Sequence, residues 1–287
     1  MIFSPGGGFF PARFYLRPAC CILSPMPNID KHVAGDFCWI ELATTDQAAA
    51  KKFYESLFGW SIYDSPMGPN EFYTMFSLEG RNTGAAYTMR KDQVAQGIPP
   101  FWMLYIATES ADASAAKAAQ LGGTVLMPAL DVMDAGRMAV IQDPAGAVFS
   151  VWQSNKHQGT QITGVDGTLC WADLSTSDQQ RAGSFYADLF GWEIMKEEEE
   201  PKHNYWHIKN GESFIGGIPP ASHRNPKIPP HWEIYLQVSD CDATAAKAKQ
   251  LGAKLYLPPT DFENVGRISV IADPQGAVFA IFKAARK

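Results

Sequence analysis

The hydrophobic positions of the chain change their period at regular intervals. Residues 37–43 form a short apolar run typical of a β-strand, in which Trp39 and Glu41 share one face because strand side chains alternate. From Gln47 to the stop at Gly59, the apolar residues recur instead at helical spacing. The apolar stripe of this helix consists of Ala50, Phe53, Tyr54, Leu57 and Phe58. The pattern predicts a β-α-β-β-β module, with its last three strands at 60–63, 73–78 and 84–89.

The same order of elements returns three times after this first module. The helices of the later modules are expected at 111–121, 178–190 and 241–251. In the second module the strands are expected at 102–108, 124–127, 138–142 and 148–153. Four β-α-β-β-β modules, two in each domain, predict an α+β fold.

The second half of the chain repeats the first. Residues 38–60 (CWIELATTDQAAAKKFYESLFGW) return as residues 170–192 (CWADLSTSDQQRAGSFYADLFGW). In the same way GRMAVIQDPAGAVF at 136–149 returns as GRISVIADPQGAVF at 266–279. The similarity is long, and the distance along the chain between each segment and its copy is nearly the same, which indicates one duplicated domain. The question of function is therefore what one copy does, and which chemical groups the two copies keep or lose.

The repeat also sets the expected domain boundaries. They place a first domain at 36–155, a linker at 156–167 and a second domain at 168–284. Residues 1–35 lie outside the repeat and carry clustered Gly and Pro, without the basic start and long apolar core of a signal peptide. We interpret them as a flexible or mis-annotated extension, with Met26 as an alternative start.

Composition and charge narrow the classes of function. The 287 residues are 46% hydrophobic, so each copy can bury a core of its own. The net charge of −6 makes nucleic acid and anionic membrane unexpected partners. Five scattered cysteines without a C-x-x-C spacing are typical of reduced thiols, which predicts a cytoplasmic protein. No stretch approaches the roughly 20 apolar residues of a membrane-spanning helix.

Two motifs point to a known family. The helix ending FYxxLFGW and the later GRxxVIxDPxGAVF resemble the vicinal oxygen chelate superfamily, which includes glyoxalase I, bleomycin-resistance proteins and extradiol dioxygenases. The resemblance covers nearly all of residues 36–284 and is nearest to tandem glyoxalase-like proteins. It implies that two modules pair so that their curled sheets form a barrel around one cavity. Because all four modules lie in one chain, a monomer is plausible.

The resemblance also implies where a metal would be held. Enzymes of this superfamily bind a divalent metal through His and Glu side chains, and the metal polarises an oxygen of the substrate or presents dioxygen. The matching positions here hold Trp39, Met103 and Ser150 in the first copy and Trp171, Glu233 and Ala280 in the second. Indole, thioether and methyl groups do not bind a hard cation, so we predict no metal cofactor. A divalent metal in the second domain, using His231 and Glu233, is the alternative that stays open.

The cavity that the fold implies would be lined by aromatic and acidic side chains. The expected lining is Trp39, Glu41, Met103, Tyr105 and Ser150 in the first domain, and Trp171, Asp173, His231, Glu233 and Tyr235 in the second. Aromatic rings beside one or two acids suit an apolar or aromatic ligand with a polar or positively charged group. Burial would raise the pKa of Glu41 and Asp173, which makes them candidate general acids or bases. Alternatively, the rings fill the barrel and the acids face solvent at a strand edge.

Three hypotheses of function follow. The first is a small-molecule-binding protein of the glyoxalase and bleomycin-resistance type that works without the family metal. The second is an enzyme, either a metal-dependent lyase or dioxygenase, or an acid–base catalyst that uses Glu41 or Asp173. The third is a scaffold whose filled sheets bind nothing and whose surface meets another protein.

Overall fold

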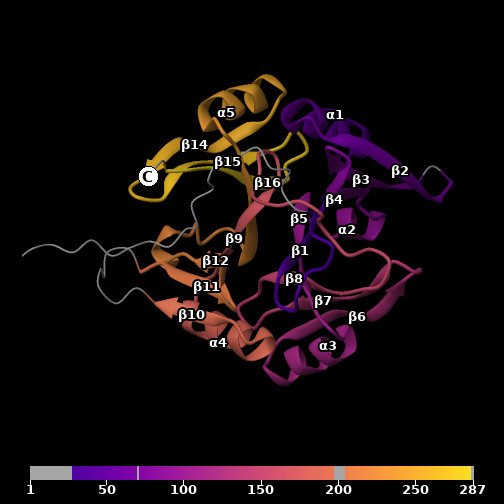
Figure 1. The fold of residues 1–287 in the computed structure, drawn as a ribbon, viewed down its shortest axis with the longest axis vertical. Helices are drawn as coiled ribbons and strands as arrows, with labels where there is room; N and C mark the ends of the chain where they lie inside the picture. The colour runs from indigo at the N-terminus through magenta and orange to yellow at the C-terminus, as the bar shows by residue number, and fades with distance from the viewer. Residues whose placement is uncertain (1–27, 70, 197–203, 286–287) are drawn as a thin grey trace, which may run out of the picture.

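Two eight-stranded mixed sheets, one for each half of the chain, form the framework of the protein (Figure 1). The computed structural model describes residues 28–69, 71–196 and 204–285. Most of the predicted extension at 1–35 therefore lies outside the described residues. The described part contains no helix long and apolar enough to cross a membrane.

The first domain contains two β-α-β-β-β modules in sequence. The first module comprises β1 (Phe37–Thr44), α1 (Gln47–Phe58), β2 (Ser61–Gly68), β3 (Glu71–Leu78) and β4 (Arg81–Thr88). After the short helix α2 (Lys91–Ala95), the second module comprises β5 (Phe101–Ala107), α3 (Ala111–Gln120), β6 (Thr124–Val132), β7 (Gly136–Gln142) and β8 (Val148–Ser154). Strand β6 runs past its expected end and through Pro128, which an edge strand with bulges tolerates.

The second domain repeats this order. Its first module comprises β9 (Leu169–Ser175), α4 (Gln179–Phe190), β10 (Glu193–Lys196), β11 (Trp206–Asn210) and β12 (Ser213–Ile218). A 3₁₀ turn at Ala221–His223 precedes the last module, which comprises β13 (His231–Gln237), α5 (Cys241–Gln250), β14 (Lys254–Phe262), β15 (Gly266–Ala272) and β16 (Val278–Ala284). The predicted α+β fold of two tandem domains is confirmed.

The modules join edge to edge within each domain. The first sheet has the order β2-β3-β4-β1-β5-β8-β7-β6, and the second has the equivalent order β10-β11-β12-β9-β13-β16-β15-β14. The antiparallel pairs β1–β5 and β9–β13 connect the two modules of each domain. Each sheet curls without closing, because its outer strands do not pair with each other.

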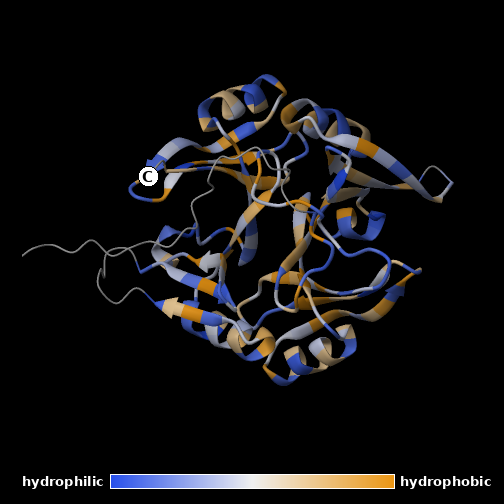
Figure 2. Ribbon diagram, in the orientation of Figure 1, coloured by the Kyte–Doolittle hydropathy of each residue, from blue (hydrophilic) through white to orange (hydrophobic). Residues whose placement is uncertain are grey.

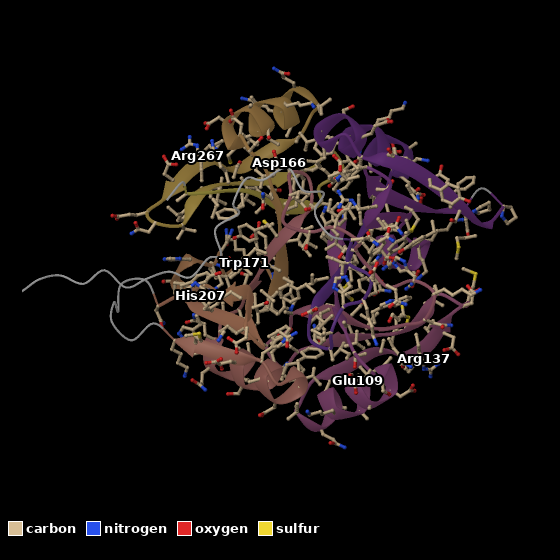
Figure 3. The ribbon with its side chains drawn as sticks, viewed as in Figure 1. Glu109, Arg137, Asp166, Trp171, His207 and Arg267 are labelled. Carbon is tan, nitrogen blue, oxygen red and sulfur yellow. The ribbon has the colours of Figure 1, made fainter. Side chains whose placement is uncertain are left out.

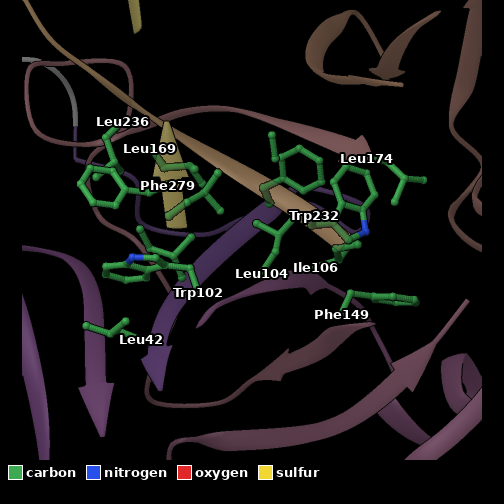
Figure 4. Packing of buried hydrophobic residues seen from close by; sticks show 14 of the residues in the cluster. Leu42, Trp102, Leu104, Ile106, Phe149, Leu169, Leu174, Trp232, Leu236 and Phe279 are labelled. Carbon is green, nitrogen blue, oxygen red and sulfur yellow. The ribbon is translucent and has the colours of Figure 1, made fainter. Parts of the chain in front are cut away.

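The helices, in contrast, pack across the domain boundary. Helix α1 lies against α5, and α3 lies against α4 (Figure 1). Between them, apolar side chains from both sheets form one continuous core (Figure 4). In β1, Ile40 and Leu42 belong to this core and are fully buried. Figure 2 shows hydrophobic residues gathered on the central strands, where the two sheets meet.

The D-P-x-G turns take part in this contact between domains. Asp143 Oδ1 accepts hydrogen bonds from the backbone N–H groups of Ala145, Gly146 and Ala147, as expected for a tight turn. Its other oxygen accepts a hydrogen bond of 3.1 Å from the hydroxyl of Tyr186, which belongs to α4 in the second domain. The turn is therefore both a local signature and an interdomain contact.

Candidate functional site

The face of each sheet that points away from the shared core carries the candidate residues. Because strand side chains alternate, Trp39 and Glu41 lie on the opposite face of β1 from Ile40 and Leu42. Strands β1 and β9 lie in the middle of their sheets. The alternative that Glu41 and Asp173 sit at a strand edge is therefore wrong.

In the first domain, four side chains from three strands form what we call the domain-one tetrad: Trp39, Glu41, Tyr73 and Tyr105. The Tyr105 hydroxyl donates to Glu41 Oε2 at 2.8 Å. The Trp39 indole N–H donates to the Tyr73 hydroxyl at 3.2 Å, and Tyr73 in turn bonds to Glu41. The carboxyl group is thus held by two phenols, one of which an indole orients.

The second domain builds the same arrangement, the domain-two tetrad: Trp171, Asp173, Tyr205 and Tyr235. Asp173 Oδ1 accepts from the Tyr205 hydroxyl at 2.5 Å and from the Trp171 indole at 3.0 Å. Asp173 Oδ2 accepts from the Tyr235 hydroxyl at 2.9 Å. The indole also donates to the Tyr205 hydroxyl at 2.9 Å. Each tetrad therefore consists of one acid, one indole and two phenols.

Burial changes the protonation chemistry of both tetrads. Burial raises the pKa of Glu41, although the hydrogen bonds from Tyr73 and Tyr105 act in the opposite direction. Asp173, only 7% exposed, has its pKa raised in the same way. Burial also raises the pKa of the Tyr105 and Tyr235 phenols well above its usual range, so both remain hydrogen-bond donors at neutral pH.

The domain-one tetrad is covered by apolar and aromatic neighbours. Trp39 is 3% exposed, and the ring of His157 packs edge-on against it at a centroid distance of 4.4 Å. His157 follows β8 in the expected linker, and its carbonyl accepts a hydrogen bond from the Trp152 indole at 2.9 Å. Met103 packs into the same cluster. Burial lowers the pKa of His157 to about 4, so this ring is neutral at physiological pH.

The domain-two tetrad has more polar neighbours and is less covered. Trp171 and Tyr235 are half-buried, whereas their equivalents Trp39 and Tyr105 are buried. Glu233 takes the place of Met103 and lies directly across the strand pair from Asp173. Its Oε1 atom is buried without a hydrogen-bond partner. Burial, together with the charge of Asp173, raises the pKa of Glu233 to about 7.

Two histidines lie on strands near the domain-two tetrad. The ring of His207, on β11, packs against that of Tyr205 at 4.9 Å and lies 6.3 Å from that of Trp171 (Figure 3). His231, at the start of β13, is half-buried, and its Nδ1 lies 2.9 Å from the carbonyl oxygen of Pro229.

The structure brings together most of the residues predicted from the sequence. Trp39, Glu41 and Tyr105 meet in one tetrad, and Trp171, Asp173 and Tyr235 meet in the other, as described above. Ser150 lies on β8 beside Tyr105 and is fully buried, and its hydroxyl has no partner. His231 does not hydrogen-bond to the acids, since its ring turns to the Pro229 carbonyl.

Sequence reasoning missed Tyr73 and Tyr205. Tyr73 lies on β3 and Tyr205 lies just before β11, and each of these strands is separated from β1 or β9 by one intervening strand. The available signal was their equivalence, because a tyrosine occupies the same place of both copies, three positions before Phe76 and Ile208. Their pairing with the acids depends on the curl of the sheet, which the strand pattern does not specify.

The donor set does not fit the metal that the family resemblance implies. Among residues 28–69, 71–196 and 204–285, no three His, Cys, Asp or Glu side chains are placed to share a metal ion. In the domain-two tetrad, both oxygens of Asp173 already accept hydrogen bonds from phenols or an indole. In the domain-one tetrad, Glu41 is the single carboxylate, and Trp39 and Met103 have no lone pair suited to a hard cation.

Two surface depressions lie away from the tetrads. One, of about 460 Å³, is lined by Asp261, Arg267 and Lys283, and the other, of about 230 Å³, lies beside Trp206. The guanidinium of Arg267 is already paired with Asp242 at 2.7 Å and with Asp261 at 2.8 Å. These depressions contain neither tetrad, so we place the candidate site at the tetrads.

Comparison with known proteins agrees with the duplicated architecture. The family model described as Glyoxalase/Bleomycin resistance protein/Dioxygenase superfamily matches residues 32–151 and again residues 168–281. The chain is 41% identical over 263 residues to the Mycobacterium tuberculosis (strain CDC 1551 / Oshkosh) protein named "Putative glyoxylase CFP32", covering 91% of this chain and 99% of that protein. It is 34% identical over 266 residues to the anthracycline biosynthesis protein DnrV of Streptomyces peucetius, covering 86% of this chain and 92% of that protein.

Solved structures share the fold at low sequence identity. The Mn(II)-bound glyoxalase from Novosphingobium aromaticivorans aligns with a TM-score of 0.61 and 15% identity, covering 87% of this chain and 83% of that one. The 2,2',3-trihydroxybiphenyl 1,2-dioxygenase from Sphingomonas wittichii strain RW1 aligns with a TM-score of 0.58 and 13% identity, covering 87% and 90%.

Proposed function

Because the chain belongs to the glyoxalase/bleomycin resistance protein/dioxygenase superfamily, we propose that it binds a small, partly aromatic molecule at its tetrads without the metal of its metalloenzyme relatives. The observation that carries this proposal is the duplication of the tetrad. A tryptophan, an acid and two tyrosines occur at equivalent places in both domains. The neighbouring positions differ: the first domain has Met103 and Ser150 where the second has Glu233 and Ala280.

The chemistry of the tetrad suits an aromatic ligand. Indole and phenol rings offer flat apolar surface, and their N–H and O–H groups are oriented by the buried acid. The acid offers a hydrogen-bond acceptor to a polar group of the ligand. The Streptomyces relative is named for the biosynthesis of anthracyclines, so a polycyclic aromatic molecule is a reasonable ligand class to test first.

We base metal independence on the donors present at the tetrads. The positions that match the superfamily's ligands carry indole, thioether, hydroxyl and methyl groups, with Glu233 as the one exception. Without three converging oxygen or nitrogen donors, a divalent cation is not held firmly enough to polarise a substrate. We therefore assign recognition to the aromatic side chains and the acids.

Titration of EDTA-treated protein with an anthracycline tests this proposal. We expect saturable quenching of tryptophan fluorescence that added Mn²⁺, Zn²⁺ or Ni²⁺ does not change. Tyr235→Phe and Tyr105→Phe should each weaken binding at their own tetrad, whereas Tyr256→Phe, at an exposed residue of β14, serves as the matched control. Binding that requires an added metal, or equal binding by all three variants and the parent protein, would overturn the proposal.

A second candidate function is acid–base catalysis by Asp173 or Glu41. The observation that favours it is the raised pKa of both buried carboxyl groups. An aromatic ligand found by titration would then be converted slowly to a new product, detected by mass spectrometry. Asp173→Asn would abolish conversion at the domain-two tetrad, and an unchanged ligand after long incubation would exclude this candidate for that ligand.

A further inference from the structure

The two tetrads differ most at Glu233. Met103 occupies the equivalent position in the first domain, where it packs among apolar side chains. Glu233 lies directly across from Asp173 on the antiparallel pair β9–β13, so two carboxyl groups share one face of the sheet. Side chains directly opposite each other in such a pair have Cβ atoms only about 4.5–5.5 Å apart.

The two carboxyl groups have opposite hydrogen-bonding situations. Asp173 accepts three hydrogen bonds, from Trp171, Tyr205 and Tyr235. Glu233 Oε1 accepts none, although it is out of contact with solvent. A buried acceptor without a partner is unfavourable and uncommon in folded proteins. A ligand that brings a hydrogen-bond donor would satisfy Glu233 Oε1.

Resting on the proposed function, we propose that the second domain carries an amine site: Glu233 and Asp173 receive the protonated amine of a ligand whose apolar or aromatic part lies against the domain-two tetrad. An ammonium group offers several N–H donors and a positive charge, so its hydrogen bonds to carboxylates are charge-assisted. The nearby rings of Trp171 and Tyr205 provide faces that also favour a cation.

The first domain has no such site. With Met103 in place of a carboxylate, the domain-one tetrad offers a ligand one acid, Glu41, and no second carboxylate with an unpartnered oxygen such as that of Glu233. The ring of His157 also covers Trp39 there. The amine site is therefore specific to the second domain, and one amine ligand per chain is expected.

A metal ion is a poorer occupant of the same position. A hard divalent cation needs about six oxygen donors, and the two acids have no third His, Cys, Asp or Glu placed with them among the described residues. An amine is satisfied by two acceptors together with aromatic faces. The stated ligand class is therefore a primary or secondary amine on an aromatic or apolar body.

Three naphthalene probes of similar size test the amine site. Calorimetric titration at pH 7.5 compares 2-(1-naphthyl)ethylamine, which is cationic, with 2-(1-naphthyl)ethanol, which is neutral, and 1-naphthylacetate, which is anionic. We expect the amine to bind at one site per chain and about tenfold or more tighter than the alcohol, with the acetate weakest.

Substitutions at Glu233 then test whether this residue causes the preference for the amine over the alcohol. Glu233→Met, which installs the first domain's residue, and Glu233→Gln, which retains shape and an acceptor, should both reduce amine binding to the level of the alcohol. Met103→Leu, in the other domain, is the matched control and should leave the preference intact. Circular dichroism shows whether each variant folds, and Glu233→Gln keeps the test valid if Glu233→Met does not.

The outcomes separate the amine site from the function on which it rests. Equal binding of the amine and the alcohol, or a preference for the amine that survives both Glu233 substitutions, overturns the amine site alone. If none of the three probes binds, and an anthracycline does not bind either, the proposed function and the amine site fall together.

Discussion

The hydroxyl of Tyr54 donates a hydrogen bond of 3.0 Å to Oδ2 of Asp273. Tyr54 lies on the first helix of the first domain, and Asp273 lies in the last D-P-x-G turn of the second. The Trp102 indole donates to the same tyrosine oxygen at 3.1 Å. The contact is mirrored by Tyr186 and Asp143, so two equivalent bonds connect the helices of each domain to the turns of the other.

Removal of the Tyr54 hydroxyl should weaken the whole molecule. In Tyr54→Phe, both the buried Asp273 oxygen and the indole N–H of Trp102 lose their partner, which should lower the free energy of unfolding by about 1–3 kcal/mol. Urea denaturation followed by circular dichroism measures the change. Tyr186→Phe should produce a similar loss because of the symmetry, whereas Tyr256→Phe should not. A Tyr54→Phe protein as stable as the parent would show that this bond contributes little.

Gly217 controls the position of Tyr205. A Cβ atom at Gly217 would collide with the Tyr205 hydroxyl, so Gly217→Ala should displace the phenol that bonds to Asp173. We expect amine-probe affinity at the domain-two tetrad to fall about tenfold, as measured by calorimetry. Gly183→Ala, on α4, adds a Cβ that makes only ordinary van der Waals contacts and serves as the control. Unchanged affinity in Gly217→Ala would mean that Tyr205 does not organise the site.

Stability should depend on pH through Glu233. The pKa of Glu233 is about 7 in the folded protein, above the reference value of 4.5. The stabilisation of the folded state by the protonated Glu233 is therefore fully present below pH 4.5 and is lost as the pH rises to 7. Relative to Glu233→Gln, the parent protein should lose up to about 3 kcal/mol of unfolding free energy across this range. Denaturation of both proteins between pH 4 and 8 measures the difference.

The neighbouring titratable groups stay the same in this comparison. Asp173 on β9, His207 on β11, His231 and Tyr235 on β13, and Tyr205 just before β11 are present in both proteins, so the two proteins differ only at position 233. A difference in stability that stays constant from pH 4 to 8 would contradict the raised pKa of Glu233.

His157 should limit access to the domain-one tetrad. In His157→Ala the ring that packs on Trp39 is removed, so Trp39 should become more accessible to acrylamide quenching. Binding of 2-(1-naphthyl)ethanol should increase toward two molecules per chain. His223→Ala, at an exposed residue, is the control. The prediction is wrong if quenching and stoichiometry remain those of the parent protein.

The duplicated sequence predicted the modules well because each carries its own periodicity and its own stops. Gly59, for example, ends α1 as expected by adopting the αL conformation, so a residue type at one position predicted the structure at that position. The interdomain bonds were not predictable in this way. The Trp60 indole donates to the Gly167 carbonyl, and Trp192 donates to the equivalent Gly35. Nothing in the spacing of these residues indicates that each tryptophan bonds to the segment just before the first strand of the other domain.

The candidate site was predicted only in part, because some of its contacts are local in the sequence and others are not. Trp39, Glu41 and their copies share a face through simple strand alternation, which the sequence specifies. The partners Tyr73 and Tyr205, and the cover that His157 provides, depend on how distant strands and the linker are arranged in three dimensions. Fold class therefore follows from the pattern, whereas the chemistry of the site requires the structure.

A crystal structure of EDTA-treated protein soaked with 2-(1-naphthyl)ethylamine tests the central claim most directly. The account predicts the naphthalene ring against Trp171 and Tyr235, the amine beside Glu233 and Asp173, and no metal ion at the tetrad. A ligand held through a metal ion, or seated instead in the depression beside Arg267 and Lys283, would contradict it.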